Sequence, residues 1–180
     1  DRAFFTKQGF EAKYADFAML QWMRHVKNDS AADADWLLYI ANGTGIHAAV
    51  VFPSTEGRYT DRIANIFTRN GIILTQRTIV FQTLDAADMF VQHLYPQEKW
   101  VANGGSRVKT KACYPQNVWT TWVLFWESSL PLPEVLSVKQ EIRALFNLGK
   151  HSIHITDTAT QAVEVAKMAL NRNSIDMLNR

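Results

Sequence analysis

The first apolar pattern in the chain has a period of three and predicts an amphipathic helix over residues 10–27. A polar, Ala-rich stretch follows over residues 28–35 and is typical of a linker. We therefore expect an N-terminal helical extension over residues 1–35 and a separate domain over residues 36–180.

Two runs rich in β-branched and aromatic residues, 36–41 and 46–52, flank the dipeptide Asn42-Gly43. Asn-Gly is the strongest short signal for a hairpin, because both residues tolerate a positive φ. The pattern predicts a β-hairpin at the start of the domain, with its second strand ending at Pro53.

From residue 46 onward, strand-like and helix-like patterns alternate. An α+β sandwich, with helices packed on a four-stranded sheet, accounts for this order. A doubly wound parallel sheet is the competing topology, but it would normally place a Gly-rich phosphate turn after the first strand, and residues 53–57 do not form one. The predicted strands are 46–52, 72–82, 118–126 and 152–156, the predicted helices are 60–70, 85–94, 133–146 and 158–170, and residues 103–111 are predicted as a loop.

Composition narrows the class of protein. The 180 residues are 47% hydrophobic and 20% charged, with a formal net charge of +2, as in soluble globular proteins. So small a positive excess gives no general grip on nucleic acid or a membrane surface, and the apolar runs are too short to span a membrane. The single cysteine, Cys113, excludes an internal disulfide framework and a cysteine-built zinc site. We expect a cytoplasmic protein, and the start at Asp1 favours a piece or a processed form of a longer chain.

The densest group of chemically versatile residues lies at positions 149–158. If residues 152–156 are extended, Ile153 and Ile155 point to one face of the sheet and His154 points to the other. The imidazole then stands just before the N-terminus of a helix, where free N–H groups and the helix dipole favour an anion.

His154 allows three interpretations. It can be a hydrogen-bonding surface residue with no further role. It can be a metal ligand together with His151 and Asp157, although strand positions three apart face opposite ways, so these side chains would converge only at a bend. It can also be a nucleophile whose neutral nitrogen attacks a phosphorus atom held at the helix terminus, while a nearby carboxylate fixes its tautomer.

Residues 46–170 resemble the nucleoside diphosphate kinases in element order and in several motifs. The segment Ile153-His154-Ile155-Thr156-Asp157-Thr158 is similar to the end of the family's last strand, where the catalytic histidine is followed by a small residue and Ser-Asp-Ser. Ile142-Arg143-Ala144-Leu145-Phe146 is similar to the family's Ile-Arg-Gly-Asp-Phe motif, whose arginine contacts nucleotide phosphates. Phe52-Pro53, Arg58, Phe67, Gly71 and Tyr95 stand at or near further family positions.

The resemblance implies a ferredoxin-like sandwich with an antiparallel four-stranded sheet, extended at its N-terminus by the predicted helix and hairpin. It also implies a phosphotransferase that moves a phosphoryl group from a nucleoside triphosphate, bound with Mg²⁺, through a phosphohistidine at His154. Besides the nucleotide, the expected partners are a second copy of the chain or further domains of a longer protein. The implied nucleotide- or phosphate-binding residues are Arg143, Arg58, Tyr95, Thr156, Thr158 and His151, and the implied histidine-orienting residues are Glu164 and Asp157.

Several departures from the family fall at functional positions. Phe52 replaces the family's lysine, the nucleotide-covering loop is too short to supply its second arginine and neighbouring threonine, and Glu164 is out of register with the histidine-orienting glutamate. Because phosphoryl transfer depends on neutralising charge on the phosphate oxygens, an active domain needs replacement cations. Arg58, Lys150 and the segment 107–111 are the candidates. The alternative is a catalytically inactive kinase-like domain that binds a nucleotide or a protein partner.

Overall fold

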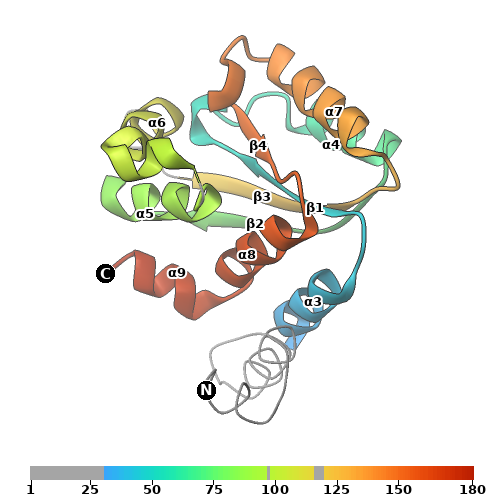
Figure 1. The fold of residues 1–180 in the computed structure, drawn as a ribbon, viewed down its shortest axis with the longest axis horizontal. Coiled ribbons are helices and arrows are strands. Elements are labelled where there is room, and N and C mark those ends of the chain that lie inside the picture. Colours follow the sequence, from blue (N-terminus) through green and yellow to red (C-terminus); the bar gives the residue numbers. More distant parts are fainter. Residues whose placement is uncertain (1–30, 97, 116–119) are drawn as a thin grey trace.

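A four-stranded sheet forms the centre of the molecule (Figure 1). Its strands lie in the order β2-β3-β1-β4, and each neighbouring pair is antiparallel. The predicted ferredoxin-like α+β sandwich is therefore confirmed, and the parallel alternative is excluded. The strands are β1 (Ile46–Val51), β2 (Ile72–Val80), β3 (Thr120–Glu127) and β4 (Ile153–Ile155) in a computed structural model that describes residues 31–96, 98–115 and 120–180.

Helices α4 (Thr60–Arg69) and α7 (Leu132–Ala144) cover one face of the sheet (Figure 1). Each helix joins two strands that are not neighbours, α4 between β1 and β2 and α7 between β3 and β4, as in a split βαβ unit. Their apolar sides meet the inward residues of the strands in one core. This core includes Ala49, Val51, Ile63, Phe67, Leu124, Trp126, Val135, Ile142, Ile153 and Ile155.

Helices α5 (Leu84–Leu94) and α8 (Ala159–Ala169) cover the opposite face, and α3 (Ala31–Asn42) and α9 (Arg172–Leu178) pack against α8 (Figure 1). None of the helices in the described ranges is both long and apolar enough to cross a membrane. The second core between these helices and the sheet includes Ala48, Val50, Phe52, Phe81, Phe90, Val123, Phe125, Ala162 and Ala166.

The predicted hairpin at the start of the domain is wrong. Residues 36–41 belong to helix α3, and the chain turns at Asn42-Gly43 directly into β1. The helix is favoured because Ala34, Leu37 and Ile40 repeat at intervals of three and are all buried, with Leu37 and Ile40 in the core on the α8 side. This repeat begins before the β-rich run, so the predicted boundary at residues 35 and 36 lies inside one helix.

The predicted loop over residues 103–111 is also wrong. A π-helical turn over Val101–Gly105 leads into helix α6 (Ser106–Cys113). Its buried positions have the spacing of a helix face, but they are Ser106, Lys109, Thr110 and Cys113. Hydropathy could not detect a buried face made of polar side chains.

The remaining predicted helices and strands from residue 46 onward are confirmed, with ends shifted by one or two residues. The start of the predicted strand 118–126 and the predicted helix 10–27 lie outside the described residues.

Candidate functional site

His154 lies on β4 at the edge of the sheet, opposite Val50 of β1. Ile153 and Ile155 are fully buried in the core under α7, so the imidazole points to the other face, as the alternation predicts. His154 is 7% exposed and borders two adjoining cavities. The walls of the two cavities share Tyr95, Glu98, His154 and Asp157.

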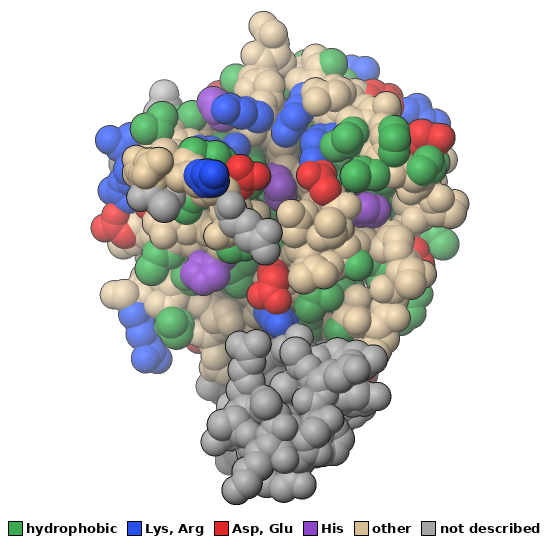
Figure 2. All heavy atoms as spheres, in the orientation of Figure 1, with side chains coloured by type: hydrophobic (Ala, Val, Ile, Leu, Met, Phe, Trp, Pro, Cys, Tyr) green, Lys and Arg blue, Asp and Glu red, His purple; other side chains and the backbone are tan. Residues whose placement is uncertain are grey.

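The larger space, which we call the cationic cavity, has a volume of about 580 Å³ and lies between α6, α7 and the 3₁₀ turn before β4. Lys and Arg side chains gather along the upper part of a hollow in this face of the molecule (Figure 2). The cavity is lined by Tyr95, Glu98, Trp100, Gly105, Val108, Lys109, Lys139, Arg143, Lys150, His151, His154 and Asp157.

The smaller space, which we call the acidic cavity, has a volume of about 430 Å³ and lies between the end of α5 and the start of α8. Three carboxylates and no lysine or arginine stand among the described residues of its wall. His154 therefore separates two spaces of opposite charge. The acidic cavity is lined by His93, Leu94, Tyr95, Pro96, Glu98, His154, Asp157, Thr158, Thr160, Gln161 and Glu164.

The imidazole of His154 is neutral at physiological pH. Its pKa is lowered to about 3, chiefly by burial and then by the nearby Lys139 ammonium, while the Asp157 carboxylate acts in the opposite direction. The Tyr95 ring meets the imidazole edge-on. Burial raises the pKa of Tyr95, so its hydroxyl is neutral too.

Two buried side-chain nitrogens of this site have no hydrogen-bond partner. They are Nε2 of His154 and Nε of Arg143, and across the described part of the chain no other buried side-chain nitrogen or oxygen lacks one. Both residues line the cationic cavity. Buried polar groups normally have partners, and leaving one unpaired costs about 1–3 kcal/mol. Two unpaired groups on one cavity point to a ligand that completes them.

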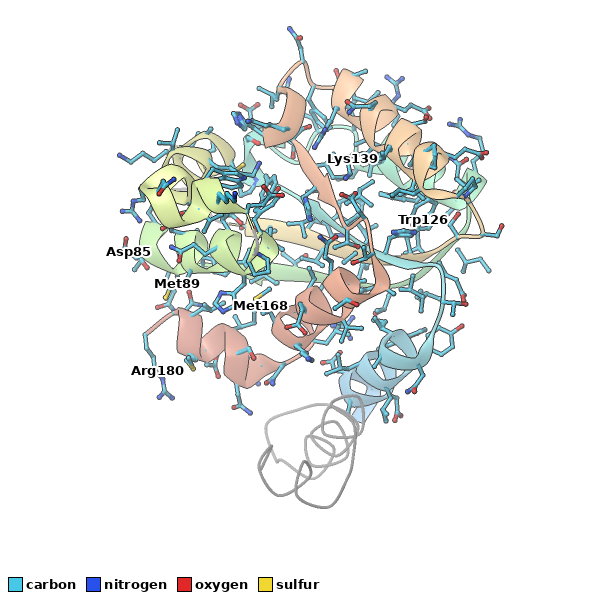
Figure 3. All side chains as sticks on the ribbon, viewed as in Figure 1. Asp85, Met89, Trp126, Lys139, Met168 and Arg180 are labelled. Atoms are coloured by element: carbon cyan, nitrogen blue, oxygen red, sulfur yellow. The ribbon has the colours of Figure 1, made fainter. Side chains whose placement is uncertain are left out.

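Four cationic side chains reach the cationic cavity from three different elements. Lys109 comes from α6, Lys139 and Arg143 come from α7, and Lys150 comes from the 3₁₀ turn. Figure 3 shows Lys139 on α7, and its ammonium donates a 2.7 Å hydrogen bond to Asp157. Of the cations expected to replace those lost from the family pattern, Lys109 and Lys150 therefore lie beside His154.

The structure brings most of the other predicted site residues to one cavity or the other. His151 lines the cationic cavity, where burial and the nearby cations, Lys109 first, lower its pKa. Thr158 lines the acidic cavity, but its hydroxyl accepts a hydrogen bond from the Gln161 N–H and caps α8. Glu164 lines the same cavity and pairs with Lys167 at 2.9 Å.

Arg58 and Thr156 lie away from both cavities. Arg58 lines a separate space of about 410 Å³ next to Trp122, and its guanidinium bonds to the Thr55 carbonyl. Thr156 is 1% exposed, and its hydroxyl accepts a 2.9 Å hydrogen bond from the Ala48 N–H. The phosphate contacts implied for Arg58 and Thr156 stay predictions that the position of neither residue supports.

The resemblance implies that Asp157 and Glu164 orient His154, but no hydrogen bond joins either carboxylate to the imidazole. Asp157 is the nearest candidate by position, but its carboxylate is bonded to Lys139, and Glu164 is bonded to Lys167. Neither imidazole nitrogen has a hydrogen-bond partner within the described ranges.

Sequence reasoning missed Lys139 and Trp100. Lys139 is 5% exposed on a helix whose other buried residues are apolar, and a lysine among apolar positions was the only available signal. Trp100 packs against Tyr95 with 5.2 Å between ring centroids, a contact that no local pattern predicts. Within the ranges described, no group of three His, Cys, Asp or Glu side chains could hold a metal ion.

No protein-family model matches this sequence, and no curated protein matches it. Among solved structures, an orthorhombic crystal form of the nucleoside diphosphate kinase of Aquifex aeolicus is similar, with 16% sequence identity and a TM-score of 0.44, over 67% of this chain and 90% of that chain. Similarity at this level does not establish a function for this chain.

Proposed function

We propose that this domain is a phosphotransferase that binds the phosphate groups of a nucleoside triphosphate in the cationic cavity and accepts a phosphoryl group on His154. The observation that carries the proposal is the presence of two buried, unpartnered nitrogens, Arg143 Nε and His154 Nε2, on one cavity that four cations line. An anion with several acceptor oxygens supplies what both the donors and the charges lack.

The charge of the cavity favours a polyanion over a single carboxylate. Asp157 and Lys139 already pair with each other. Among the other described wall residues, Glu98 is the carboxylate, and Lys109, Arg143 and Lys150 are the cations. Charge-assisted hydrogen bonds to phosphate oxygens are the usual way to satisfy such a group of cations.

The aromatic part of the wall favours a nucleotide over inorganic phosphate. Tyr95 and Trp100 stand together at one side of the cavity, with Gly105 and Val108 next to them. A ligand with phosphates at one end and a flat base at the other would use both halves of this wall.

The nucleophile follows from the burial of the ring. A neutral imidazole keeps the lone pair that a nucleophile needs, and the low pKa of His154 keeps it neutral. In the neutral ring Nε2 carries the proton and would donate it to a ligand oxygen, and Nδ1 keeps the lone pair that would attack. The Nδ1 lone pair bonds to the terminal phosphorus, and the bond from that phosphorus to the bridging oxygen breaks, with its electron pair leaving on the diphosphate. Transfer to an acceptor reverses these steps, and Mg²⁺ enters and leaves with the nucleotide as part of the substrate.

A second candidate is binding without transfer. The unpartnered Nε2 favours it, because no carboxylate among the described residues orients the imidazole, and the two acidic candidates pair with Lys139 and Lys167. In this case the cavity would hold the nucleotide as a structural or regulatory ligand.

The test is incubation with ATP labelled on its γ-phosphate, using wild type and His154→Ala. We expect label on the wild type that is stable to base and labile to acid, as a phosphohistidine is, and none on the variant. Label should then pass to an added nucleoside diphosphate. ATP binding measured by calorimetry without any labelled protein would favour the second candidate, and no ATP binding would refute both.

A further inference from the structure

The ammonium group of Lys109 is buried against two aromatic rings. Its Nζ lies 5.3 Å from the centroid of the Phe52 ring and 5.2 Å from that of the Tyr95 ring, and the residue is 8% exposed. Phe52 directly follows β1 and Tyr95 directly follows α5, so three separate parts of the chain meet at this nitrogen. An aromatic face attracts a cation, and it does so more strongly where water is excluded.

This ammonium has no counter-ion among the described residues. Its one hydrogen bond runs to the carbonyl oxygen of Lys150, at 2.9 Å, and no carboxylate of the described ranges lies within ion-pair distance. An ammonium has three donors, so two remain for another acceptor. Burying an unpaired charge is costly, and burial together with the nearby Lys150 and Arg143 lowers the pKa of Lys109.

The other three cations of the cavity are engaged or exposed. Lys139 is bonded to Asp157, Arg143 donates to the Ile153 carbonyl at 3.4 Å, and Lys150 lies at the solvent-exposed edge. Lys109 is therefore the buried lysine of the cavity that is free to take an anionic ligand.

We infer that Lys109 is a catalytic residue whose ammonium contacts the phosphoryl group that is transferred at His154. This inference rests on the proposed function and names the cation that neutralises the transferred group. The Tyr95 ring touches both residues, since it faces the Lys109 nitrogen and meets the imidazole edge-on. The Phe52 ring packs against the same ammonium.

The test compares Lys109→Met, Lys109→Arg and Lys111→Met with wild type. Lys111 lies on the same helix, is exposed and lines neither cavity, so it controls for the change in net charge. Binding of sodium tripolyphosphate is measured by calorimetry at constant ionic strength, and labelling of His154 is measured with ATP. We expect Lys109→Met to bind tripolyphosphate about 10- to 100-fold more weakly, as loss of one charged hydrogen bond would produce.

The arginine variant separates a catalytic role from a structural one. Arginine keeps its charge at high pH, whereas the desolvated ammonium of Lys109 loses its proton earlier than an ordinary lysine would. Wild-type affinity should therefore fall at a lower pH than the titration of an ordinary lysine would produce, and Lys109→Arg should bind with a flatter pH profile. Tyr95, Cys113, Arg143 and Lys150 face the same nitrogen and are unchanged in every variant.

The outcomes distinguish this inference from the proposed function. If wild type and Lys109→Met bind tripolyphosphate equally well and both become labelled at His154, the role of Lys109 is overturned and the proposed function stands. Equal losses in Lys109→Met and Lys111→Met also overturn that role, because net charge would then explain both. Wild type that binds neither tripolyphosphate nor ATP overturns the proposed function and this inference together.

Discussion

The Tyr95 ring meets the His154 imidazole edge-on, with 4.7 Å between the ring centroids and an angle of 65° between the planes. In this position the phenol covers the imidazole on the side where the two cavities adjoin. Burial under Tyr95 and between α5 and α8 is the main cause of the low pKa of His154. His154, the proposed nucleophile, is therefore also a source of pH-dependent stability.

We predict that the free energy of unfolding decreases as the pH falls from 6.5 toward 3. The pKa of His154 is lowered from 6.5 to about 3, so in this window the unfolded chain binds a proton that the folded protein does not. The contribution is fully present above pH 6.5 and declines by at most about 1.4 kcal/mol per pH unit below it. Urea unfolding at pH 7, 6 and 5 measures the slope.

His154→Leu is the comparison for this slope, because leucine fills the space and binds no proton. The lowered pKa of His151 adds a change of the same sign to both proteins, so the difference between them isolates His154. Parallel slopes in wild type and variant would mean that the imidazole is not buried in its neutral form.

Arg143→Lys should weaken tripolyphosphate binding about tenfold, although it keeps the charge. The guanidinium offers Nε and a terminal nitrogen in one plane, and its buried Nε has no partner until a ligand supplies one. Lysine cannot donate in this geometry. Arg69→Lys is the matched control, since Arg69 is an exposed partner of Glu141. Equal affinities for Arg143→Lys and wild type, measured by calorimetry, would show that the guanidinium does not contact the ligand.

Thr156→Val should lower the free energy of unfolding by about 1–3 kcal/mol and leave tripolyphosphate affinity unchanged. The buried hydroxyl accepts from the Ala48 N–H, and valine leaves that donor unpaired. Thr156→Ser keeps the hydroxyl and should retain most of the stability. A variant of normal stability with impaired binding would restore the phosphate contact that the sequence implied for Thr156.

The sequence predicted the part of the site that depends on local periodicity. Ile153 and Ile155 alternate with His154, so the face on which the imidazole lies follows from the pleat of the strand. The predicted helix 158–170 is present as α8, and Thr158 occupies its cap, a position that threonine prefers. For the same reason the strand and helix patterns after residue 46 predicted an α+β sandwich, whereas the ferredoxin-like topology was implied by the resemblance.

The position of the Thr156 side chain could not be predicted from local periodicity. Thr156 has the same parity as His154 and would share its face if the strand continued, but β4 ends at Ile155. The Thr156 hydroxyl then bonds back to β1 through Ala48. Alternation holds only within regular strand, and the sequence did not define the last residue of β4 closely enough.

The cations could not be located from the sequence, because their convergence depends on packing. Lys109 stands on a helix with a polar buried face, which the hydropathy pattern assigned to a loop. Lys139 and Arg143 share one face of α7 and reach the cavity because β4 is an edge strand. Residues 109 and 150 are distant in sequence and are joined by a hydrogen bond that only the fold creates.

Asp157→Asn should change stability and anion binding in opposite directions. The Asp157 carboxylate is the partner of the Lys139 ammonium, whose side chain is 7% exposed, and the amide would leave that charge without a counter-ion among the described residues. Because the Asp157 side chain is itself 45% exposed and screened by solvent, we expect a loss of only about 1–3 kcal/mol in the free energy of unfolding.

The same change frees Lys139 for a ligand, so tripolyphosphate should bind about three- to tenfold more tightly, an energy typical of one added charge near a protein surface. Asp176→Asn makes the same change in net charge on α9, away from both cavities, and should alter neither quantity. Urea unfolding and calorimetry on the two variants check the pair of effects. Weaker binding by Asp157→Asn would show that the carboxylate itself takes part in holding the ligand.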